Sequence, residues 1–387
     1  MILFQTEILG TIVWFFMFFV FIFLYPRLML SQLIYKIEQS ARKMEQMSDA
    51  ANRMVVRKIA KKPADEMKGK VKEFVDFFVV EPSSIDPYGL VKKIDVIVKQ
   101  MESRFDEFVD NVAGDKGYKD RQEINYGLRA AMALNQISKI VRHNVELAKK
   151  FKNLQIAMIL QMQLPIIEKI AESELKGTEA FVNGLPIGDS IGPLVAASMI
   201  DTSREIAEDV VIGTKTIKGR KCFIMKAKGP APHLGRIDDA IAWIMKRNKI
   251  DRIITIDAAL KLEGEKSGSV AEGVGFAMGG FQRELIESYL LPLKKPIDSI
   301  VIKVGLMEAI MPMKKEIFDS LQKANGYVEK AVERTKKGGK IIIIGVGNSC
   351  GIGDTTKTMD DVKRMVIEID KRYKKEEAQS KKGGRWI

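Results

Sequence analysis

The chain has 387 residues, of which 46% are hydrophobic and 29% are charged, so it can bury a core and is not a disordered polymer. Its two cysteines, Cys222 and Cys350, cannot form a disulfide framework, and two histidines leave little for a His/Cys zinc site. The formal net charge is +13, but aromatic residues are not interleaved with the basic ones. An anionic membrane surface therefore explains the charge better than nucleic acid does.

The segment from Ile8 to Tyr25 carries no charge, and as a helix it would span about 27 Å, close to the hydrocarbon thickness of a bilayer. Residues 1–7 contain no Lys or Arg, and large residues follow the apolar run, so it lacks the features of a signal peptide. Seven basic residues lie between positions 27 and 58. By the positive-inside rule, we expect residues 1–30 to be a single-pass anchor in the cell membrane, with the N-terminus outside and the bulk of the chain cytoplasmic.

Residues 31–62 have the pattern of one polar helix with a weak heptad seam. The seam residues are Leu33, Ile37, Ser40, Met44, Met47, Ala51 and Met54. One interpretation is a coiled coil that joins two copies of the chain into a homodimer. The other is a solvated helix that lies on lipid headgroups or on its own domain.

Residues 63–175 are predicted to be helical. One apolar face begins at Leu90 and another at Ile124, each at helical spacing, and a Gly-containing break falls at 114–117. The apolar run 158–167 is too short, and too broken by Gln161, Gln163 and Pro165, to be a second membrane span.

Residues 176–358 alternate short β-rich runs with helical patterns, which favours a three-layer α/β/α domain with a largely parallel sheet. Residues 359–387 are predicted to be a basic C-terminal helix and tail. The expected strands are 210–217, 221–227, 252–256, 299–304 and 340–344, and the expected helices are 236–247, a helix from Gln282 and 316–335.

Open α/β sheets bind ligands at the carboxyl ends of their strands, and Gly-rich loops occupy these positions here. The first loop contains Asp189, which is either functional or a first-turn acid of the helix that follows. Asp257 is predicted to end a buried apolar strand, where an acid must be solvated by a cleft, a metal or a partner.

The third loop follows strand 340–344 and has its glycines at Gly345, Gly347, Gly351 and Gly353. Successive amides in such a loop can hold phosphate, but the spacing matches neither a dinucleotide fingerprint nor a P-loop. A nucleotide or phosphate site on this loop is therefore an alternative prediction. Cys350 as a nucleophile would need a base, and His233 is its one candidate.

Over its whole length the chain resembles an uncharacterised archaeal family of membrane-anchored proteins. The residues that carry this resemblance are Tyr25-Pro-Arg-Leu28, Gly188-Asp-Ser-Ile-Gly-Pro193 and Lys261-Leu-Glu-Gly-Glu265. It implies a lineage but no activity.

A second, remote resemblance covers residues 178–312. Gly188–Val195, Ile256-Asp-Ala258, Gly279–Ile286 and Met307-Glu308 recur in an order similar to that of the hydrogenase maturation endopeptidases and the spore germination protease. The resemblance implies that Asp189 and Asp257 are catalytic or metal-contacting carboxylates. Those endopeptidases place a His where this chain offers Glu308, a change that favours hard cations over soft ones. Ser190 and Asn348 are supporting candidates.

Together these features predict a membrane-tethered hydrolase, acting on a protein or peptide substrate through Asp189 and Asp257. The two acids would either hold a divalent metal or share one proton. The sequence does not identify the cofactor. The alternatives are a non-catalytic ligand- or protein-binding module, for which the Gly345–Gly353 loop would matter more than the acids, and a dimeric membrane scaffold.

The expected topology can be tested with a reporter fused to the C-terminus. A reporter that is active only in the cytoplasm should be active in this fusion, because the basic residues after the apolar run keep that side in the cytoplasm. Activity only from a reporter that works outside the membrane would contradict the assignment.

Overall fold

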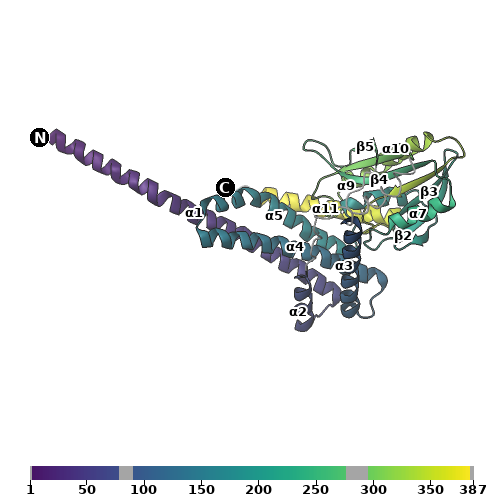
Figure 1. Ribbon diagram of the computed structural model, residues 1–387, viewed down its shortest axis with the longest axis horizontal. Helices are drawn as coiled ribbons and strands as arrows, with labels where there is room; N and C mark the ends of the chain where they lie inside the picture. Colours follow the sequence, from purple (N-terminus) through teal and green to yellow (C-terminus); the bar gives the residue numbers. More distant parts are fainter. Residues whose placement is uncertain (1, 78–89, 276–294, 384–387) are drawn as a thin grey trace.

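The computed structural model describes residues 2–77, 90–275 and 295–383, which form a helical N-terminal part followed by an α/β part (Figure 1). The helices of the first part are α1 (Ile2–Ile59), α2 (Asp65–Phe74), α3 (Leu90–Ala113), α4 (Tyr118–Phe151) and α5 (Leu154–Val182). The predicted break at 114–117 is confirmed, since α3 ends and α4 begins there. The helical part extends past residue 175, because α5 runs through Gly177, which packs against Ile310.

Helix α1 is continuous for 58 residues, and its first part projects alone from the rest of the molecule (Figure 1). The large apolar side chains from Ile12 to Tyr25 are all exposed. Within the described chain, two helices are long and apolar enough to cross a membrane, α1 and α5. The projecting part of α1 is therefore a candidate membrane anchor, whereas α5 is a helix of the bundle.

The second part of α1 packs against α4 and α5. Its seam residues Leu33, Ile37, Met44 and Ala51 are buried in a core shared with these two helices. The seam therefore lies inside the chain's own core, as the own-domain interpretation expects. A homodimer stays a prediction, and it would need a different surface.

The described residues of the α/β part form one seven-stranded sheet with the order β1-β2-β3-β7-β4-β6-β5. Its strands are β1 (Arg204–Ala207), β2 (Val210–Ile217), β3 (Arg220–Ala227), β4 (Arg252–Leu260), β5 (Val270–Val274), β6 (Ile297–Val304) and β7 (Lys340–Gly345). The central strands β3, β7, β4 and β6 are parallel, while β1, β2 and β5 join antiparallel at the edges. The sheet is thus mixed rather than largely parallel.

Helices cover both faces of this sheet. One face packs against α6 (Ile191–Ala197), α9 (Lys315–Asp319), α10 (Leu321–Glu333) and α11 (Met359–Gly383). The other face packs against α7 (Ile237–Arg247). The predicted layers are therefore present, but strand 252–256 continues to Leu260, because its second half still pairs with β6. The helix expected from Gln282 lies outside the described residues.

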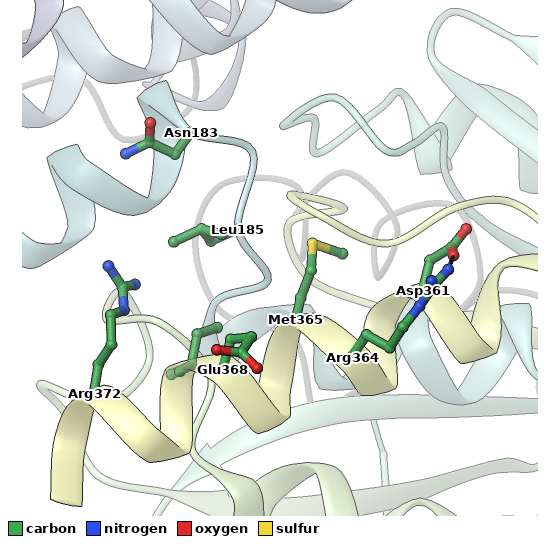
Figure 2. A pocket seen from close by; sticks show the side chains of 8 residues that line it. Asn183, Leu185, Asp361, Arg364, Met365, Glu368 and Arg372 are labelled. Atoms are coloured by element: carbon green, nitrogen blue, oxygen red, sulfur yellow. Dashed lines mark hydrogen bonds and ion pairs between the residues drawn. The ribbon is translucent and has the colours of Figure 1, made fainter. Parts of the chain in front are cut away.

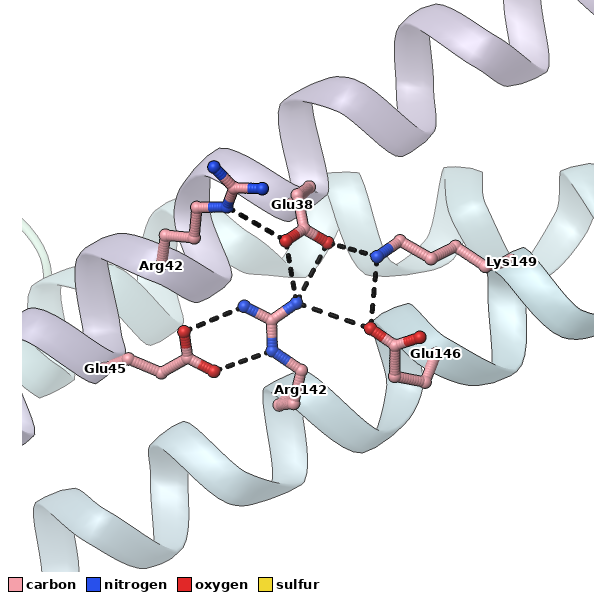
Figure 3. A network of polar contacts seen from close by, with 6 residues as sticks. All are labelled: Glu38, Arg42, Glu45, Arg142, Glu146 and Lys149. Atoms are coloured by element: carbon pink, nitrogen blue, oxygen red, sulfur yellow. Dashed lines mark hydrogen bonds and ion pairs between the residues drawn. The ribbon is translucent and has the colours of Figure 1, made fainter.

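An ion-pair network fastens α1 to α4 (Figure 3). Arg142 on α4 contacts Glu38 at 2.9 Å and Glu45 at 2.6 Å, both on α1. Lys149 reaches Glu38 at 2.5 Å, and the exposed Arg42 reaches the same carboxylate at 3.0 Å. Lys149, and then Arg142 and Arg42, hold the pKa of Glu38 at about 2 although burial opposes them. The network therefore fixes the register of the second part of α1 against α4.

The Arg142→Met variant should lose about 1–2 kcal/mol of unfolding free energy at neutral pH, since it removes a largely buried partner of Glu38 and the partner of Glu45. Arg42→Met removes a partner of the same Glu38 but should cost less than about 0.5 kcal/mol, because Arg42 is 69% exposed and Arg142 only 26%. Urea denaturation of the full chain in detergent micelles measures both values.

The pH dependence of that difference follows from Glu38. Its pKa is lower in the folded state, so its contribution is present above its ordinary value of 4.5 and is lost as the pH falls toward 2. The unfolding free energies of the Arg142→Met and Arg42→Met variants should therefore converge as the pH falls from 4.5 toward 2. Equal losses for Arg42→Met and Arg142→Met at neutral pH would contradict the account.

Candidate functional site

Asp189 lies in a short turn between the helical part and the α/β part. The turn is the 3-10 helix η1 (Gly188–Ser190), which leads directly into α6. Backbone bonds hold it against the loop after β6: the Gly188 amide donates to Met311 at 3.1 Å, and the Asp189 amide donates to Ala309 at 2.8 Å. Just before the turn, Ile187 forms a single antiparallel bridge with Pro312. Asp189 is therefore positioned by a loop that lies more than a hundred residues away in the sequence.

Asp257 lies within β4, three residues before its end, and not at the end as expected. It is 6% exposed. Its carboxylate accepts a backbone hydrogen bond from Ala258. It pairs in register with Val301 of β6, so it occupies the carboxyl-terminal half of a central strand. Such a position places an acid at the edge where parallel α/β sheets bind ligands.

The two acids influence each other electrostatically. Burial raises the pKa of Asp257 well above its usual range, and the charge of Asp189 raises it further. Burial also raises the pKa of Asp189, against a hydrogen bond from the Asn348 amide. No hydrogen bond within the described residues joins the two carboxyl groups directly. Two desolvated acids with mutual repulsion do not both ionise easily, so the pair favours a state with one proton.

The Gly-rich loop after β7 meets the Asp189 turn. The Asn348 amide donates to Asp189 Oδ2 at 2.8 Å, and the Asn348 side chain accepts from the Cys350 amide at 2.9 Å. The structure thus brings together Asp189 and Asn348, two residues that the sequence proposed separately. Asn348 orients the acid through its backbone, while its side chain shapes the loop.

Most amides of this loop are already occupied. Those of Val346, Asn348, Ser349, Cys350, Gly351 and Ile352 all donate to acceptors within the chain. A phosphate cradle needs amides that point at the ligand. Most amides of the loop are therefore committed to contacts within the chain, and a nucleotide or phosphate site stays a prediction.

The glycines of this loop are required by close backbone contacts. A Cβ at Gly347, which has φ +121°, would overlap the Asp189 carbonyl oxygen. A Cβ at Gly192 would overlap the carbonyl oxygens of Val346 and Ile256. The other predicted loop glycines also face crowded neighbours: Gly345 meets Gly192 and Ala196, Gly351 meets Leu185 and Pro186, and Gly353 meets Thr358. These glycines allow backbone segments to touch.

Glu308 does not present a free carboxylate. It accepts from Ser267 at 2.6 Å and from the Gly305 amide at 2.8 Å, and it pairs with Lys314 at 2.7 Å. Burial alone would raise its pKa, but these partners lower it to about 2. Its side chain therefore fastens the 305–314 loop, whose backbone supports the Asp189 turn.

The remaining candidates are structural in this arrangement. The buried Ser190 donates to the Cys350 carbonyl at 3.1 Å. Burial raises the pKa of the Cys350 thiol, so it is not an activated nucleophile. The His233 ring contacts Tyr118 at 2.9 Å and Asp209 at 3.1 Å, and in the described part of the chain it makes no hydrogen bond to Cys350.

A buried lysine was missed by the sequence reasoning. Lys226, at the end of β3, is fully buried and pairs with Asp354 at 2.8 Å, and Asp354 also accepts from the Gly229 amide. Burial lowers the pKa of Lys226 although Asp354 opposes this. The pair fixes the far end of the Gly-rich loop. A lysine within the apolar run 221–227 was the available signal.

A metal ion would find few ligands at this site. Among the residues that the structure describes, no group of three or more His, Cys, Asp or Glu side chains converges. Asp189 and Asp257 would have to bind a hard cation with water completing its shell. The donor set thus favours proton sharing between the acids over a resident metal.

A separate open groove of about 630 Å³ lies between the turn after α5 and helix α11 (Figure 2). Its lining residues are Asn183, Leu185, Asp361, Arg364, Met365, Glu368, Ile369 and Arg372. Neither Asp189 nor Asp257 lines it, so the groove and the acid pair are distinct features.

The chain belongs to a family described as a protein of unknown function, DUF1512. The family's N-terminal domain matches residues 11–184, and its C-terminal domain matches residues 187–353. The boundary between the two matches coincides with the turn that joins α5 to η1. No curated protein and no solved structure matches the chain.

The Asp257→Asn variant should be more stable than the natural protein at pH 8, with a melting temperature higher by a few degrees. The folded state binds the Asp257 proton more tightly than the unfolded chain does, so stability is fully present below about pH 4 and is lost as the pH rises through the folded pKa. Asparagine does not ionise and so avoids this loss of stability. The difference in melting temperature between the variant and the natural protein should therefore vanish at pH 4. Thermal unfolding of the full chain at several pH values measures it.

Asp298→Asn is the matched control. Asp298 is 5% exposed but pairs with Arg252 at 2.6 Å, so its replacement should destabilise the protein at pH 8. Destabilisation by Asp257→Asn at both pH values would show that Asp257 is a paired structural acid.

Proposed function

We propose that this DUF1512 protein is a membrane-tethered hydrolase whose active centre is the carboxylate pair Asp189 and Asp257, and that its substrate is a peptide bond. The observation that carries the proposal is the electrostatic coupling of the two acids, which come from a turn and a strand far apart in the sequence. Purely structural acids are normally paired with cations, as Asp298 and Glu308 are here. Perturbed and unpaired acids are more typical of functional sites.

The different surroundings of the two acids assign their roles. Asp257 is 6% exposed, and burial and then the charge of Asp189 raise its pKa, so Asp257 holds its proton to a higher pH than an ordinary carboxyl group does. Asp189 is partly exposed and accepts the Asn348 amide hydrogen bond, which stabilises its ionised form. Asp189 is therefore the general base and Asp257 the general acid.

The reaction then balances without another reagent. Asp189 takes a proton from water as the oxygen–carbon bond to the peptide carbonyl forms. Asp257 gives its proton to the nitrogen as the carbon–nitrogen bond breaks. A proton returned from Asp189 to Asp257 restores the starting state, and the products are a carboxylic acid and an amine.

Two further observations support the proposal. The order of the Gly188–Val195, Ile256–Ala258 and Met307-Glu308 segments is similar to that in the hydrogenase maturation endopeptidases, where the corresponding acids are catalytic. The exposed apolar part of α1 suits a tether, with the N-terminus outside and the catalytic part in the cytoplasm. Gly279–Ile286, which also carries the resemblance, lies outside the described residues.

The test is cleavage of a peptide library by the full chain in lipid nanodiscs, followed by mass spectrometry. Asp189→Asn and Asp257→Asn should each lower turnover by about 10²–10⁴-fold, as expected when a general acid or base is removed. Asp257→Asn is expected to be a stabilised protein, so its loss of activity cannot result from unfolding.

Asp201→Asn is the control for activity, because Asp201 is an exposed acid paired with Lys215 on the rim of the sheet. It should leave turnover unchanged. If both acid variants retain full turnover of any peptide that the natural protein cleaves, the carboxylate pair is not the active centre.

A further inference from the structure

The connection between α4 and α5 presents apolar side chains to solvent. Four large ones are exposed in the residues from Phe151 to Met162, at the end of α4 and in the first turns of α5. They are Phe151, Met158, Ile159 and Met162. The most apolar part of α5 is long and apolar enough for a membrane span, yet most of it is not buried. We call these four residues, with Lys150 and Lys152, the hairpin patch.

Ion pairs fix the place of this patch along α1. Lys149, near the end of α4, contacts Glu38, while Lys58 contacts Glu123 near the start of α4. Helix α4 thus runs antiparallel to α1, and its end lies toward the anchor. In Figure 1 the left ends of α4 and α5 lie where α1 begins to project alone. The hairpin patch is therefore at the anchor end of the bundle.

The level of the patch can be estimated from the helix rise. Lys43 of α1 pairs with Glu168 of α5, and α5 runs in the same direction as α1, so Leu154, fourteen residues before Glu168, is about level with Met29. Met29 lies roughly 6 Å beyond Tyr25 along the helix axis, and the headgroup layer is roughly 5–8 Å thick on each side of a bilayer. The hairpin tip is thus level with the headgroups.

The charge of the patch fits the same surroundings. Lys150 and Lys152 are exposed and flank Phe151, and Lys150 lies 5.6 Å from the Phe151 ring centre. No acid forms an ion pair with either lysine in the described part of the chain. Apolar side chains beside unpaired lysines are typical of segments that lie at an anionic lipid surface.

We propose that the hairpin patch is a second membrane contact, which inserts Phe151 and the first turns of α5 into the headgroup region of an anionic leaflet beside α1. The inference rests on the proposed anchoring of α1. This second contact prevents the helical bundle from rotating about the axis of α1, since one side of the bundle is held at the membrane. The α/β part, at the opposite end of the molecule, is thereby held at a defined distance from the lipid.

The test uses the full chain in nanodiscs with a fluorophore on one introduced cysteine, because the natural Cys222 and Cys350 are both fully buried. Phe151→Cys reports the patch. Ile140→Cys on α4 is the matched control, since both native side chains are 62% exposed but Ile140 lies eleven residues from the tip. Phe16→Cys reports the anchor. Quenching by spin-labelled lipids is compared in phosphatidylcholine discs with and without phosphatidylserine.

The expected result is strong lipid quenching at position 151, which increases with phosphatidylserine, and little quenching at position 140. Equal quenching at 151 and 140, with position 16 quenched, would overturn this inference and leave the anchor intact. Absence of quenching at position 16 would instead refute the anchor. A label at 151 that is shielded from aqueous iodide but not quenched by lipid would mean that protein covers the patch, and it would also overturn the inference.

The double variant Lys150→Gln, Lys152→Gln tests the role of charge. Phosphatidylserine should favour the lipid-bound over the lipid-free state of the hairpin patch. Each lysine removed should lower this effect on the equilibrium constant by about fivefold. Lys323→Gln with Lys330→Gln, two exposed lysines on α10, should have no effect. An unchanged dependence on phosphatidylserine in the Lys150/Lys152 variant would contradict an anionic lipid partner.

Discussion

The close contact of three backbone segments is the constraint on which the candidate site depends. The Asp189 turn, the end of β4 and the loop after β7 approach so closely that Gly192 and Gly347 have no room for a side chain. This contact lets the Asn348 amide reach Asp189 and lets the charge of Asp189 act on Asp257. The glycines therefore permit this contact. Close-packed segments also exclude water, which strengthens the repulsion between the acids.

The two parts of the chain meet at the same place. Helix α5 ends seven residues before Asp189, and the salt bridge between Lys58 and Glu123 lies beside the intervening Gly184. The second part of α1 is fixed to α4 by the network around Arg142, and α4 reaches the turn after α5 through Glu123. A continuous set of contacts thus joins α1, which begins with the candidate anchor, to the acid pair. The hairpin patch would fix the other end of this bundle relative to the lipid.

Local patterns in the sequence predicted the elements well but predicted their partners poorly. The strand 210–217 and the helical face from Ile124 are confirmed, because alternation and helical spacing report which side of an element is buried. The heptad seam of α1 is also a true buried face. Its spacing could not say whether the partner was another chain or α4 and α5, since both would bury the same residues. The mixed order of the sheet likewise depends on edge strands whose pairing no local pattern specifies.

The sequence by itself determined that the chain has an apolar N-terminal helix, a helical region and an α/β region, and that Asp189 and Asp257 stand in Gly-rich surroundings. These features depend on residue type and spacing within one segment. Only the tertiary structure decided that Glu308 is neutralised by Lys314, that most amides of the 346–352 loop are already occupied, and that the charge of Asp189 acts on Asp257. Each of these depends on contacts between segments that are distant in the chain, and the pKa of an acid is set by such neighbours and by burial rather than by its adjacent residues.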